Sequence, residues 1–426
     1  MSTETILILG GSFAGIGAAH FCLRHVLPAL PKKEGVTYNL TMVNPSKDMF
    51  WRLAAPRASV SKAMMPAKKI LYPIEPAFAY AASQFKFVQG TATHVDPAGQ
   101  TVSVITAEGE QQSIHYAALV IATGFSTPSP LFTQQTDAAA LESVYDAFQA
   151  RLKKAKTVVI GGGGPVGVET AGEVAELLNG KPGFMASGPK NPKAKVTLVC
   201  GDKKLLPVLR EAMGKTAQQY LKRLGCDVVY NTKVVSANPV GGDEGAKTKV
   251  DLSNGESIEA DIYIDATGSR PNTGFLPKEW LGDRNKVAAN PQTLRVDHAS
   301  AQRVYVVGDV GSHTRGGVMD QAEHIPVAMT NLKTDLIAHL TGSPPASGDR
   351  HFTPNLKESQ LVPIGTQKGV GAFNGHRIPS QFVWAIKGRD YLVGMMVQPT
   401  LNGDQFKKDG KWKPVPEAGK VGLSSG

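Results

Sequence analysis

Two glycine-rich turns are the part of this chain with the clearest chemical use. Each follows a short apolar stretch: ILILGGSFAG occupies residues 6–15, and VVIGGGGPVGVETAGE occupies residues 158–173. Each is followed later by an apolar stretch that ends in Ala-Thr-Gly, at residues 118–124 and 262–268. One signature used twice predicts two dinucleotide sites, and two dinucleotides held face to face predict electron transfer between them.

The first turn has most of the residues that a pyrophosphate site requires. Gly10 permits the tight turn, the small Ser12 lets the backbone approach the pyrophosphate, and Gly15 lets the helix pack on the strand. Free N–H groups and a partial positive charge at the helix amino end favour a diphosphate. The next strand, YNLTMVN, ends in Asn44 where an acidic residue is expected, but an asparagine can still accept a ribose hydroxyl. The predicted contacts of this turn are Gly10, Gly11, Ser12, Phe13, Ala14, Gly15 and Asn44.

The second turn keeps all three glycine positions. The strand after it, VTLVC, ends at Cys200 without the acidic residue that favours NADH. Lys203, Lys204 and Arg210 follow, and they either meet a 2′-phosphate or are solvated surface charges. The choice between NADH and NADPH therefore stays open. The predicted contacts of this turn are Gly162, Gly164, Pro165, Val166, Gly167, Glu169, Thr267 and Gly268.

A third element assigns the flavin to the first site. VYVVGDVG (304–311) is a buried-strand pattern with Asp309 at its end. An acid there suits the hydroxyls of the FAD ribityl chain, although aspartate is also common in a plain strand-end turn. The predicted FAD contacts therefore also include Ala122, Thr123, Gly124, Gly308 and Asp309.

In this order the motifs resemble the FAD-dependent pyridine nucleotide–disulfide oxidoreductase superfamily. ATGSRPNT at residues 266–273 adds to the likeness. Within the superfamily, residues 54–58, 362–375 and 383–394 resemble the AMID-like branch, which contains apoptosis-inducing factor homologues and ferroptosis suppressor protein. The similarity runs across nearly the whole chain.

The resemblance implies further flavin contacts. The helix in MDQAEHIPVAMTNL (319–332) is expected to point its amino end at the flavin. Gln321 and Ala322 are then FAD contacts, and the N–H groups of this helix end stabilise the negative charge of the reduced ring. The resemblance also places Arg57 and Trp51 where the chain wraps the flavin, and one of them is expected to touch it.

Three side chains are implied as catalytic. The resemblance places Glu169 near nicotinamide and flavin, as an orienting or proton-relay group, and Lys387 near the flavin. His324 matches a helix histidine of the branch, and its ordinary pKa suits proton transfer to a reduced quinone. Each has a plainer alternative: Glu169 caps backbone amides, Lys387 is a surface charge, and His324 is simply a packed or solvent-facing helix residue.

The expected fold class is α/β, with two Rossmann-like dinucleotide-binding domains (three-layer β/β/α) and a smaller α+β C-terminal domain. A chain of 426 residues is long enough for two to three domains. The expected divisions are an FAD domain at 1–145 and 285–342, an NAD(P)H domain at 146–284, and a C-terminal domain at 343–426. Residues 27–39 are expected to be a surface loop, and residues 125–130 and 343–349 to be linkers.

The cysteines exclude disulfide exchange as the chemistry. Only Cys22, Cys200 and Cys226 occur, and no CxxC or CxxxxC pair is present. Electrons are therefore expected to leave the flavin directly for a diffusing acceptor. Core packing is the expected role of Cys22 and Cys200, and no metal site is predicted.

Charge and targeting signals bear on location. There is no amino-terminal signal sequence and no apolar run of about eighteen residues, and serine at position 2 excludes myristoylation, so a cytoplasmic protein is expected. The net charge is +10, and residues 345–426 hold eleven Lys and Arg against six Asp and Glu. Peripheral contact with an acidic membrane, nucleic-acid binding and an ordinary solvated edge all explain this excess, and charge alone does not choose. A nucleic-acid partner is the less expected of these, and the oligomeric state is not indicated.

The leading functional hypothesis is a flavoenzyme that passes electrons from NADH or NADPH through FAD to a quinone or similar small acceptor. Within the same class, a tailoring oxidase or dehydrogenase of a specialised metabolite is the alternative. A redox-responsive binding protein, in which turnover is incidental, is the alternative of a different class.

Overall fold

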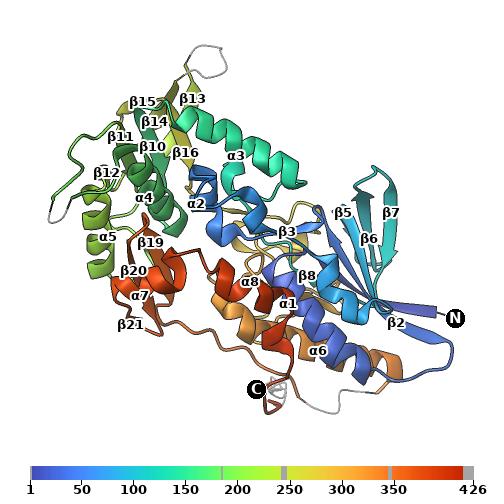
Figure 1. The fold of residues 1–426 in the computed structure, drawn as a ribbon. Coiled ribbons are helices and arrows are strands. Elements are labelled where there is room, and N and C mark those ends of the chain that lie inside the picture. The colour runs from blue at the N-terminus through green and yellow to red at the C-terminus, as the bar shows by residue number, and fades with distance from the viewer. Residues whose placement is uncertain (1, 184–185, 241–246, 344–347, 416–426) are drawn as a thin grey trace, which may run out of the picture.

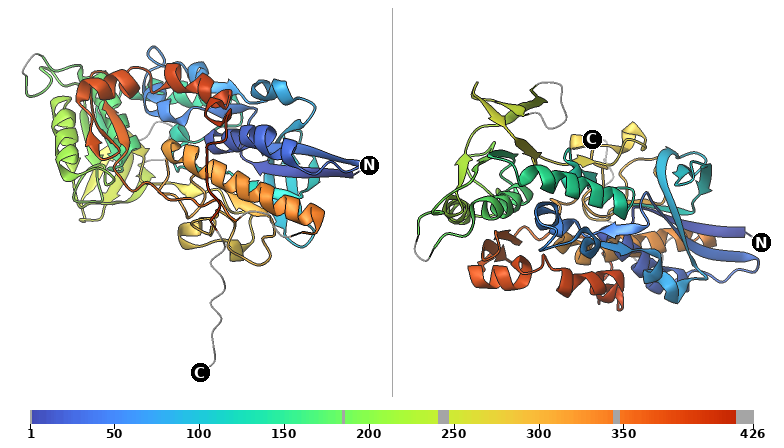
Figure 2. Two further views of the ribbon diagram at one scale, coloured as in Figure 1. Left: turned by 90° about the horizontal axis from the view of Figure 1, so that it is seen from below. Right: turned by 45° about the horizontal axis from the view of Figure 1, so that its top comes forward.

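The computed structural model describes residues 2–183, 186–240, 247–343 and 348–415. Two α/β units lie side by side, and a C-terminal segment crosses both of them (Figures 1 and 2). The first unit contains the amino terminus and the second contains α4 (Pro165–Asn179).

The first unit is built on a seven-stranded sheet in the order β18-β8-β1-β2-β5-β6-β7. Strands β18, β8, β1, β2 and β5 are parallel, whereas β6 and β7 continue from the far half of β5 as an antiparallel meander. Helices α1 and α6 pack against each other beside this sheet. The bounds are β1 Ser2–Leu9, α1 Phe13–Phe21, β2 Val36–Asn44, β5 Phe85–Asp96, β6 Thr101–Thr106, β7 Gln111–His115, β8 Ala118–Ile121, β18 Val304–Val306 and α6 Gln321–Thr341.

The second unit repeats this plan with a four-stranded parallel sheet in the order β12-β11-β10-β16. A separate antiparallel sheet, β13-β14-β15, turns at Asn254 and Gly255, where Gly255 has φ +87° as an Asn-Gly turn requires. The bounds are α3 Ala138–Leu152, β10 Thr157–Gly161, α4 Pro165–Asn179, β11 Lys195–Val199, α5 Glu211–Arg223, β12 Cys226–Val229, β13 Val234–Pro239, β14 Thr248–Leu252, β15 Ser257–Ala260 and β16 Ile262–Asp265.

The C-terminal segment is α+β and touches both units. Its antiparallel sheet β19-β20-β21 packs on α4 and α5 of the second unit, while α8 packs on α1 of the first. Between these contacts runs a π-helix, η10, which brings Lys387 towards α4. The bounds are β19 Gln360–Ile364, β20 Lys368–Phe373, β21 His376–Arg377, α7 Ser380–Val383, η10 Trp384–Gly388 and α8 Val393–Leu401.

Short elements connect the units. The helix α2 packs on α3 and α4, and β9 pairs with β17. The predicted linker at 125–130 therefore includes a strand that joins the two units. The bounds are β3 Asp48–Phe50, α2 Ala55–Val60, β4 Leu71–Pro73, β9 Phe125–Ser126 and β17 Arg270–Pro271, with 3-10 helices at Leu27–Ala29, Arg52–Ala54, Ala67–Ile70, Glu75–Ala81, Pro130–Phe132, Lys278–Trp280, Asp283–Asn285, Val318–Asp320 and Asp404–Phe406.

The α/β fold class is confirmed, but one local expectation is wrong. The predicted loop at 27–39 ends early, because β2 begins at Val36 and pairs with β1 from Ser2 onwards. Most of the predicted linker at 343–349 lies outside the described residues. No helix among the described residues is long and apolar enough to cross a membrane.

Candidate functional site

The two glycine turns have the same backbone geometry. Gly10 has φ +111°, and a Cβ added there would lie 2.3 Å from the carbonyl oxygen of Ala122. Gly162 has φ +118°, and its added Cβ would lie 2.2 Å from the carbonyl oxygen of Ala266. Each turn glycine is thus pressed against the alanine of its own Ala-Thr-Gly segment. This contact explains why each glycine-rich turn occurs together with an Ala-Thr-Gly segment.

The third glycines close the helix onto the turn in both units. A Cβ on Gly15 would lie 1.8 Å from the oxygen of Gly10, and one on Gly167 would lie 1.9 Å from the oxygen of Gly162. Only glycine allows the helix to start so close to its strand. The amino ends of α1 and α4 are consequently fixed at the carboxyl ends of β1 and β10.

Space is free beside Gly164 of the second turn and beside the glycine that ends each Ala-Thr-Gly segment. A Cβ added to Gly164, Gly124 or Gly268 would meet no atom within 4 Å. Neither α1 nor α4 has a side chain that caps its first N–H groups. Uncapped amides, the positive end of the helix dipole and free space above them are what a diphosphate group requires. Both turns therefore fit a dinucleotide.

Asn44 braces the first turn from the neighbouring strand. Its Oδ1 accepts a hydrogen bond from the Gly11 N–H at 2.8 Å, and its Nδ2 donates to the Ser46 carbonyl at 2.6 Å. The side chain is buried. These two hydrogen bonds of Asn44 hold the first turn in place. The predicted contact of Asn44 with a ribose hydroxyl stays a prediction.

Asp309 lies at the carboxyl end of β18, after Gly308 with φ +76°. Its Oδ1 accepts the Gly317 N–H at 2.9 Å. Burial lowers the pKa of Arg52, and the nearby Asp309 opposes this shift. Arg52 donates to the Phe125 carbonyl at 2.9 Å, just after the first Ala-Thr-Gly. Sequence reasoning missed this arginine, although it lies two residues before segment 54–58, which resembles the AMID-like branch.

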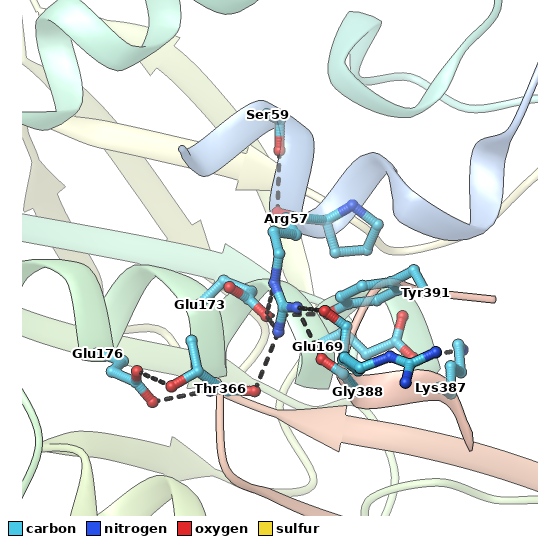
Figure 3. Close-up of polar contacts among 12 residues, drawn as sticks. Arg57, Ser59, Glu169, Glu173, Glu176, Thr366, Lys387, Gly388 and Tyr391 are labelled. Atoms are coloured by element: carbon cyan, nitrogen blue, oxygen red, sulfur yellow. Dashed lines mark hydrogen bonds and ion pairs between the residues drawn. The ribbon is translucent and has the colours of Figure 1, made fainter. Parts of the chain in front are cut away.

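A cluster of five buried side chains lies where α2, α4 and the C-terminal segment meet (Figure 3). We call it the buried charge cluster, and its members are Arg57, Glu169, Glu173, Lys387 and Tyr391. Lys387 Nζ lies 2.6 Å from Glu169 Oε1 and donates to the Leu361 carbonyl at 3.0 Å. Each ion of the cluster is thus paired, as the low dielectric of a protein interior requires.

The second ion pair of the cluster joins Arg57 to Glu173. Arg57 donates to Glu173 Oε1 through Nη2 at 2.7 Å and through Nε at 3.0 Å. It also donates to the Gly388 carbonyl at 2.7 Å. The Tyr391 hydroxyl donates to the same Glu173 oxygen at 3.1 Å. The guanidinium of Arg57 is therefore engaged within the protein, and its predicted flavin contact stays a prediction.

The cluster shifts the pKa values of its members. Burial raises the pKa of Glu169, and the charge of Lys387 opposes that rise. Burial alone would lower the pKa of Arg57, but the charge and hydrogen bond of Glu173 outweigh it, so the net shift is upward. Burial raises the pKa of Tyr391 well above its usual value. A buried carboxyl with a raised pKa beside an ammonium group is suited to exchanging a proton.

Comparison with known proteins identifies the family. Residues 4–331 match the model of the pyridine nucleotide-disulphide oxidoreductase family. The chain is 42% identical to oxidoreductase phnG of Penicillium herquei over 92% of this chain and 94% of the relative. The chain belongs to this family.

More distant similarities cover the same length. The chain is 28% identical to ferroptosis suppressor protein 1 of Xenopus laevis, over 91% of this chain and 93% of that protein. The solved sulfide:quinone oxidoreductase of Aquifex aeolicus has the same fold, with a TM-score of 0.67 at 16% identity over 94% of this chain and 92% of that one. The expected AMID-like resemblance is confirmed.

As a family member, the protein is a flavin-dependent oxidoreductase that uses FAD with NAD(P)H. The first turn, α1 and Asp309 fit the FAD, and the second turn with the amino end of α4 fits the nicotinamide dinucleotide. Gln321 and Ala322 open α6, which continues the 3-10 helix Val318–Asp320, and the Gln321 N–H donates to the Val318 carbonyl. No side chain caps this helix end, and its predicted contact with the flavin stays a prediction.

His324 lies in a different environment from the one that a proton donor to quinone requires. It is fully buried, its Nε2 accepts the Gly308 N–H at 3.0 Å, and burial lowers its pKa to about 4. The imidazole is therefore neutral near pH 7, and it supports the strand end that carries Asp309. Its catalytic role stays a prediction.

The basic residues after β11 do not decide between NADH and NADPH. Arg210 pairs with Glu358 through Nε at 2.7 Å, and Lys204 donates to the Leu209 carbonyl. Lys203 is exposed. Two of the three predicted 2′-phosphate ligands are thus engaged with other groups of the protein.

The three cysteines are free and buried. Burial raises the pKa of Cys22 and raises that of Cys226 to about 12, so both are protonated thiols near pH 7. This agrees with packing as their role. Sequence reasoning assigned no function to Glu173 or Tyr391, because their partners are distant in the chain.

Proposed function

We propose that the electron acceptor of this flavoenzyme is a small diffusing molecule of the quinone type. When bound, FAD would supply the transfer of electrons from NAD(P)H to the acceptor, and the protein supplies placement and electrostatics. The observation that carries the proposal is the buried Lys387–Glu169 pair at 2.6 Å, one turn into the helix that starts at the second glycine turn. Quinone reduction consumes protons as well as electrons, and this pair can hold a proton at Glu169 Oε1 or Lys387 Nζ.

Two further features support direct transfer to a diffusing acceptor. The described cysteines form no pair, so no dithiol relay is available among them. The sulfide:quinone oxidoreductase that shares the fold acts on quinone, as its name states. We extend this acceptor class to the present chain as a proposal.

The test is anaerobic reduction followed by reoxidation. FAD-loaded protein is mixed with NADH or NADPH in a stopped-flow instrument, and the reduced protein is then mixed with a panel of quinones, oxygen and dyes. Turnover with at least one quinone, faster than with oxygen, is expected. If nicotinamide oxidation stays stoichiometric with every acceptor, the enzyme proposal fails and a redox-responsive binding protein is favoured.

Two matched variants on α4 test whether Glu169 takes part in turnover. Glu169→Gln removes the ionisable group of the pair, whereas Glu176→Gln changes a carboxylate two turns further along α4 that accepts the Thr366 N–H at 2.9 Å. Glu169→Gln is expected to slow turnover by about a hundredfold and Glu176→Gln by less than about twofold. Equal rates in the two variants would remove Glu169 from the chemistry.

A tailoring oxidase or dehydrogenase of a specialised metabolite is the second candidate. It is favoured by the higher identity to the fungal oxidoreductase phnG, 42%, than to ferroptosis suppressor protein 1, 28%. Fast nicotinamide oxidation that needs a specialised metabolite as second substrate, with slow turnover on simple quinones, would identify this candidate.

We also propose a peripheral membrane contact for the C-terminal segment, which contains Lys387. Phe382, Trp384 and Met395 are exposed, with Phe382 at 61%. The exposed Arg389 lies nearby, 3.9 Å from Asp390. Co-sedimentation with anionic vesicles that is lost in Phe382→Ser/Trp384→Ser would support this contact. Equal sedimentation with neutral and anionic vesicles, unchanged by the substitutions, would contradict it.

A further inference from the structure

The turn after Lys387 has an unfavourable backbone. Tyr391 has φ +54° and Leu392 has φ +67°, and the pair links η10 to α8. The left-handed region disfavours residues with a side chain, and two such residues in succession persist only where the surroundings hold them. Unfavourable backbone of this kind is concentrated at functional sites.

Tyr391 is held by contacts from the first unit and from α4. Trp51 of the first unit donates its Nε1–H to the Tyr391 carbonyl at 2.9 Å. Glu173 of α4 accepts the Tyr391 hydroxyl at 3.1 Å. The ring is fully buried, and the guanidinium carbon of Arg57 lies 4.8 Å from its centroid. Backbone, hydroxyl and ring are each contacted by a different residue.

The same turn fixes Lys387. The Tyr391 N–H donates to the Lys387 carbonyl at 2.6 Å, which closes the turn. Lys387 Nζ lies 5.7 Å from the Tyr391 ring centroid and 2.6 Å from Glu169 Oε1. Figure 3 shows Arg57, Tyr391 and Lys387 gathered against the α4 carboxylates. A displacement of this turn would therefore move the ammonium group away from Glu169.

We propose that Tyr391 is a positioning residue for the Lys387–Glu169 pair, held by Trp51 and Glu173 so that the ammonium and the carboxylate stay in contact. The inference rests on the proposed function of that pair. It assigns to Tyr391 no contact with cofactor or acceptor.

The first test measures the lysine directly. FAD-loaded Tyr391→Phe protein receives a short pulse of acetic anhydride, and the acetylation of Lys387 is measured by mass spectrometry. Labelling is expected to rise about tenfold over the wild type, because a buried, ion-paired ammonium is shielded and a displaced one is not. The matched control is Tyr145→Phe, which removes another buried hydroxyl, bonded to the Leu131 carbonyl at 3.0 Å, and is expected to leave Lys387 labelling unchanged.

The second test measures the rate and pH dependence of reoxidation of the NAD(P)H-reduced protein by a quinone. Tyr391→Phe is expected to slow this reoxidation about tenfold at unchanged NAD(P)H affinity. Burial raises the pKa of Glu169, and Lys387 and Arg57 oppose that rise while Glu173 adds to it. Loss of the Lys387 contact should raise that pKa further, so the pH profile should move to higher pH. Tyr145→Phe should move neither rate nor profile.

The outcomes separate the proposals. Tyr391→Phe could lower only the melting temperature, with Lys387 labelling, reaction rate and pH profile equal to those of Tyr145→Phe. That result would overturn the proposal that Tyr391 positions the Lys387–Glu169 pair. If Tyr391→Phe does not fold, Trp51→Phe, with its FAD content verified, replaces it and should give the same increase in labelling. If Glu169→Gln leaves the rate of reoxidation by quinone unchanged, the proposed function of the pair fails, whatever Tyr391→Phe does to the labelling of Lys387.

Discussion

The two nucleotide-binding units share a turn but differ in the helix that follows it. The first glycines have φ +111° and +118° and press on equivalent alanine carbonyls. The helix α1, however, is almost wholly buried and has no acidic or strongly basic side chain. The helix α4 buries Glu169 and Glu173, whose cationic partners come from other parts of the chain. The turn therefore fits a dinucleotide in both units, whereas among the described residues buried carboxylates with cationic partners occur only on the helix that follows the second turn.

The histidines also differ between the two units, because the buried ones lie in or against the first unit. All ten lie outside residues 146–284. His20, His313 and His324 are buried in the first unit or against it, and burial lowers the pKa of each. The first unit is thus expected to lose stability in acid, whereas the second unit contains the buried ion pairs.

The largest predicted effect breaks the ion pair of the second unit. Arg57→Met leaves Glu173 buried without its cation, which is expected to lower the free energy of unfolding by about 3–5 kcal/mol. The exposed Lys62–Asp146 pair is the control, and Lys62→Met is expected to lower the melting temperature far less than Arg57→Met. Thermal unfolding of the two variants checks this. Equal melting temperatures would show that the cluster contributes no more than a surface pair.

The next prediction separates the two turns. Gly10→Ala and Gly162→Ala each place a Cβ where a carbonyl oxygen stands, at an expected cost of about 2–3 kcal/mol. Gly10→Ala is expected to lose FAD on desalting. Gly162→Ala is expected to keep FAD but not to be reduced by NAD(P)H. Absorbance at the flavin band before and after NAD(P)H distinguishes them, and loss of both properties in both variants would contradict separate sites.

Acid is expected to act on the first unit. The pKa of His20 is lowered to about 4 by burial, so folded His20 stays neutral between pH 6.5 and 4 while the unfolded chain takes up a proton. Stability is complete above pH 6.5 and falls as the pH decreases, by about 2 kcal/mol at pH 5 from this residue alone. Release of flavin fluorescence between pH 6.5 and 4.5 should report it, and His20→Gln should flatten the curve. A curve that His20→Gln leaves unchanged would assign the acid sensitivity to other groups.

The smallest predicted effect fills the open space of the second turn without disturbing the fold. Gly164 has φ −77° and no atom within 4 Å of its added Cβ. Gly164→Val should therefore keep FAD and the melting temperature but weaken NAD(P)H binding about tenfold, close to 1.4 kcal/mol. Unchanged NAD(P)H affinity would show that the nucleotide lies elsewhere.

The parts of the fold that were predictable from sequence are those that the backbone dictates locally. Gly10, Gly162 and their Ala-Thr-Gly partners can be recognised because only glycine tolerates that conformation and that approach. The start of β2 at Val36 was missed because the residues before it are rich in proline, lysine and glycine, which suggested a longer loop.

The buried charge cluster was not predictable in the same way. Arg57 and Glu173 are 116 residues apart, and Glu169 and Lys387 are 218 apart. No local pattern states which cation meets which carboxylate, because the pairing depends on how α2 and η10 pack on α4. Family resemblance indicated Glu169 and Lys387, placed Arg57 and Trp51 where one of them is expected to touch the flavin, and did not identify Tyr391.

The central claim is that the first turn holds a flavin and the second presents NAD(P)H to it. The most direct measurement is the visible spectrum of the purified protein under anaerobic conditions, before and after one equivalent of NADH or NADPH. We expect a yellow protein whose flavin band is bleached by NADH, by NADPH or by both. A protein that stays colourless after incubation with excess FAD would contradict it.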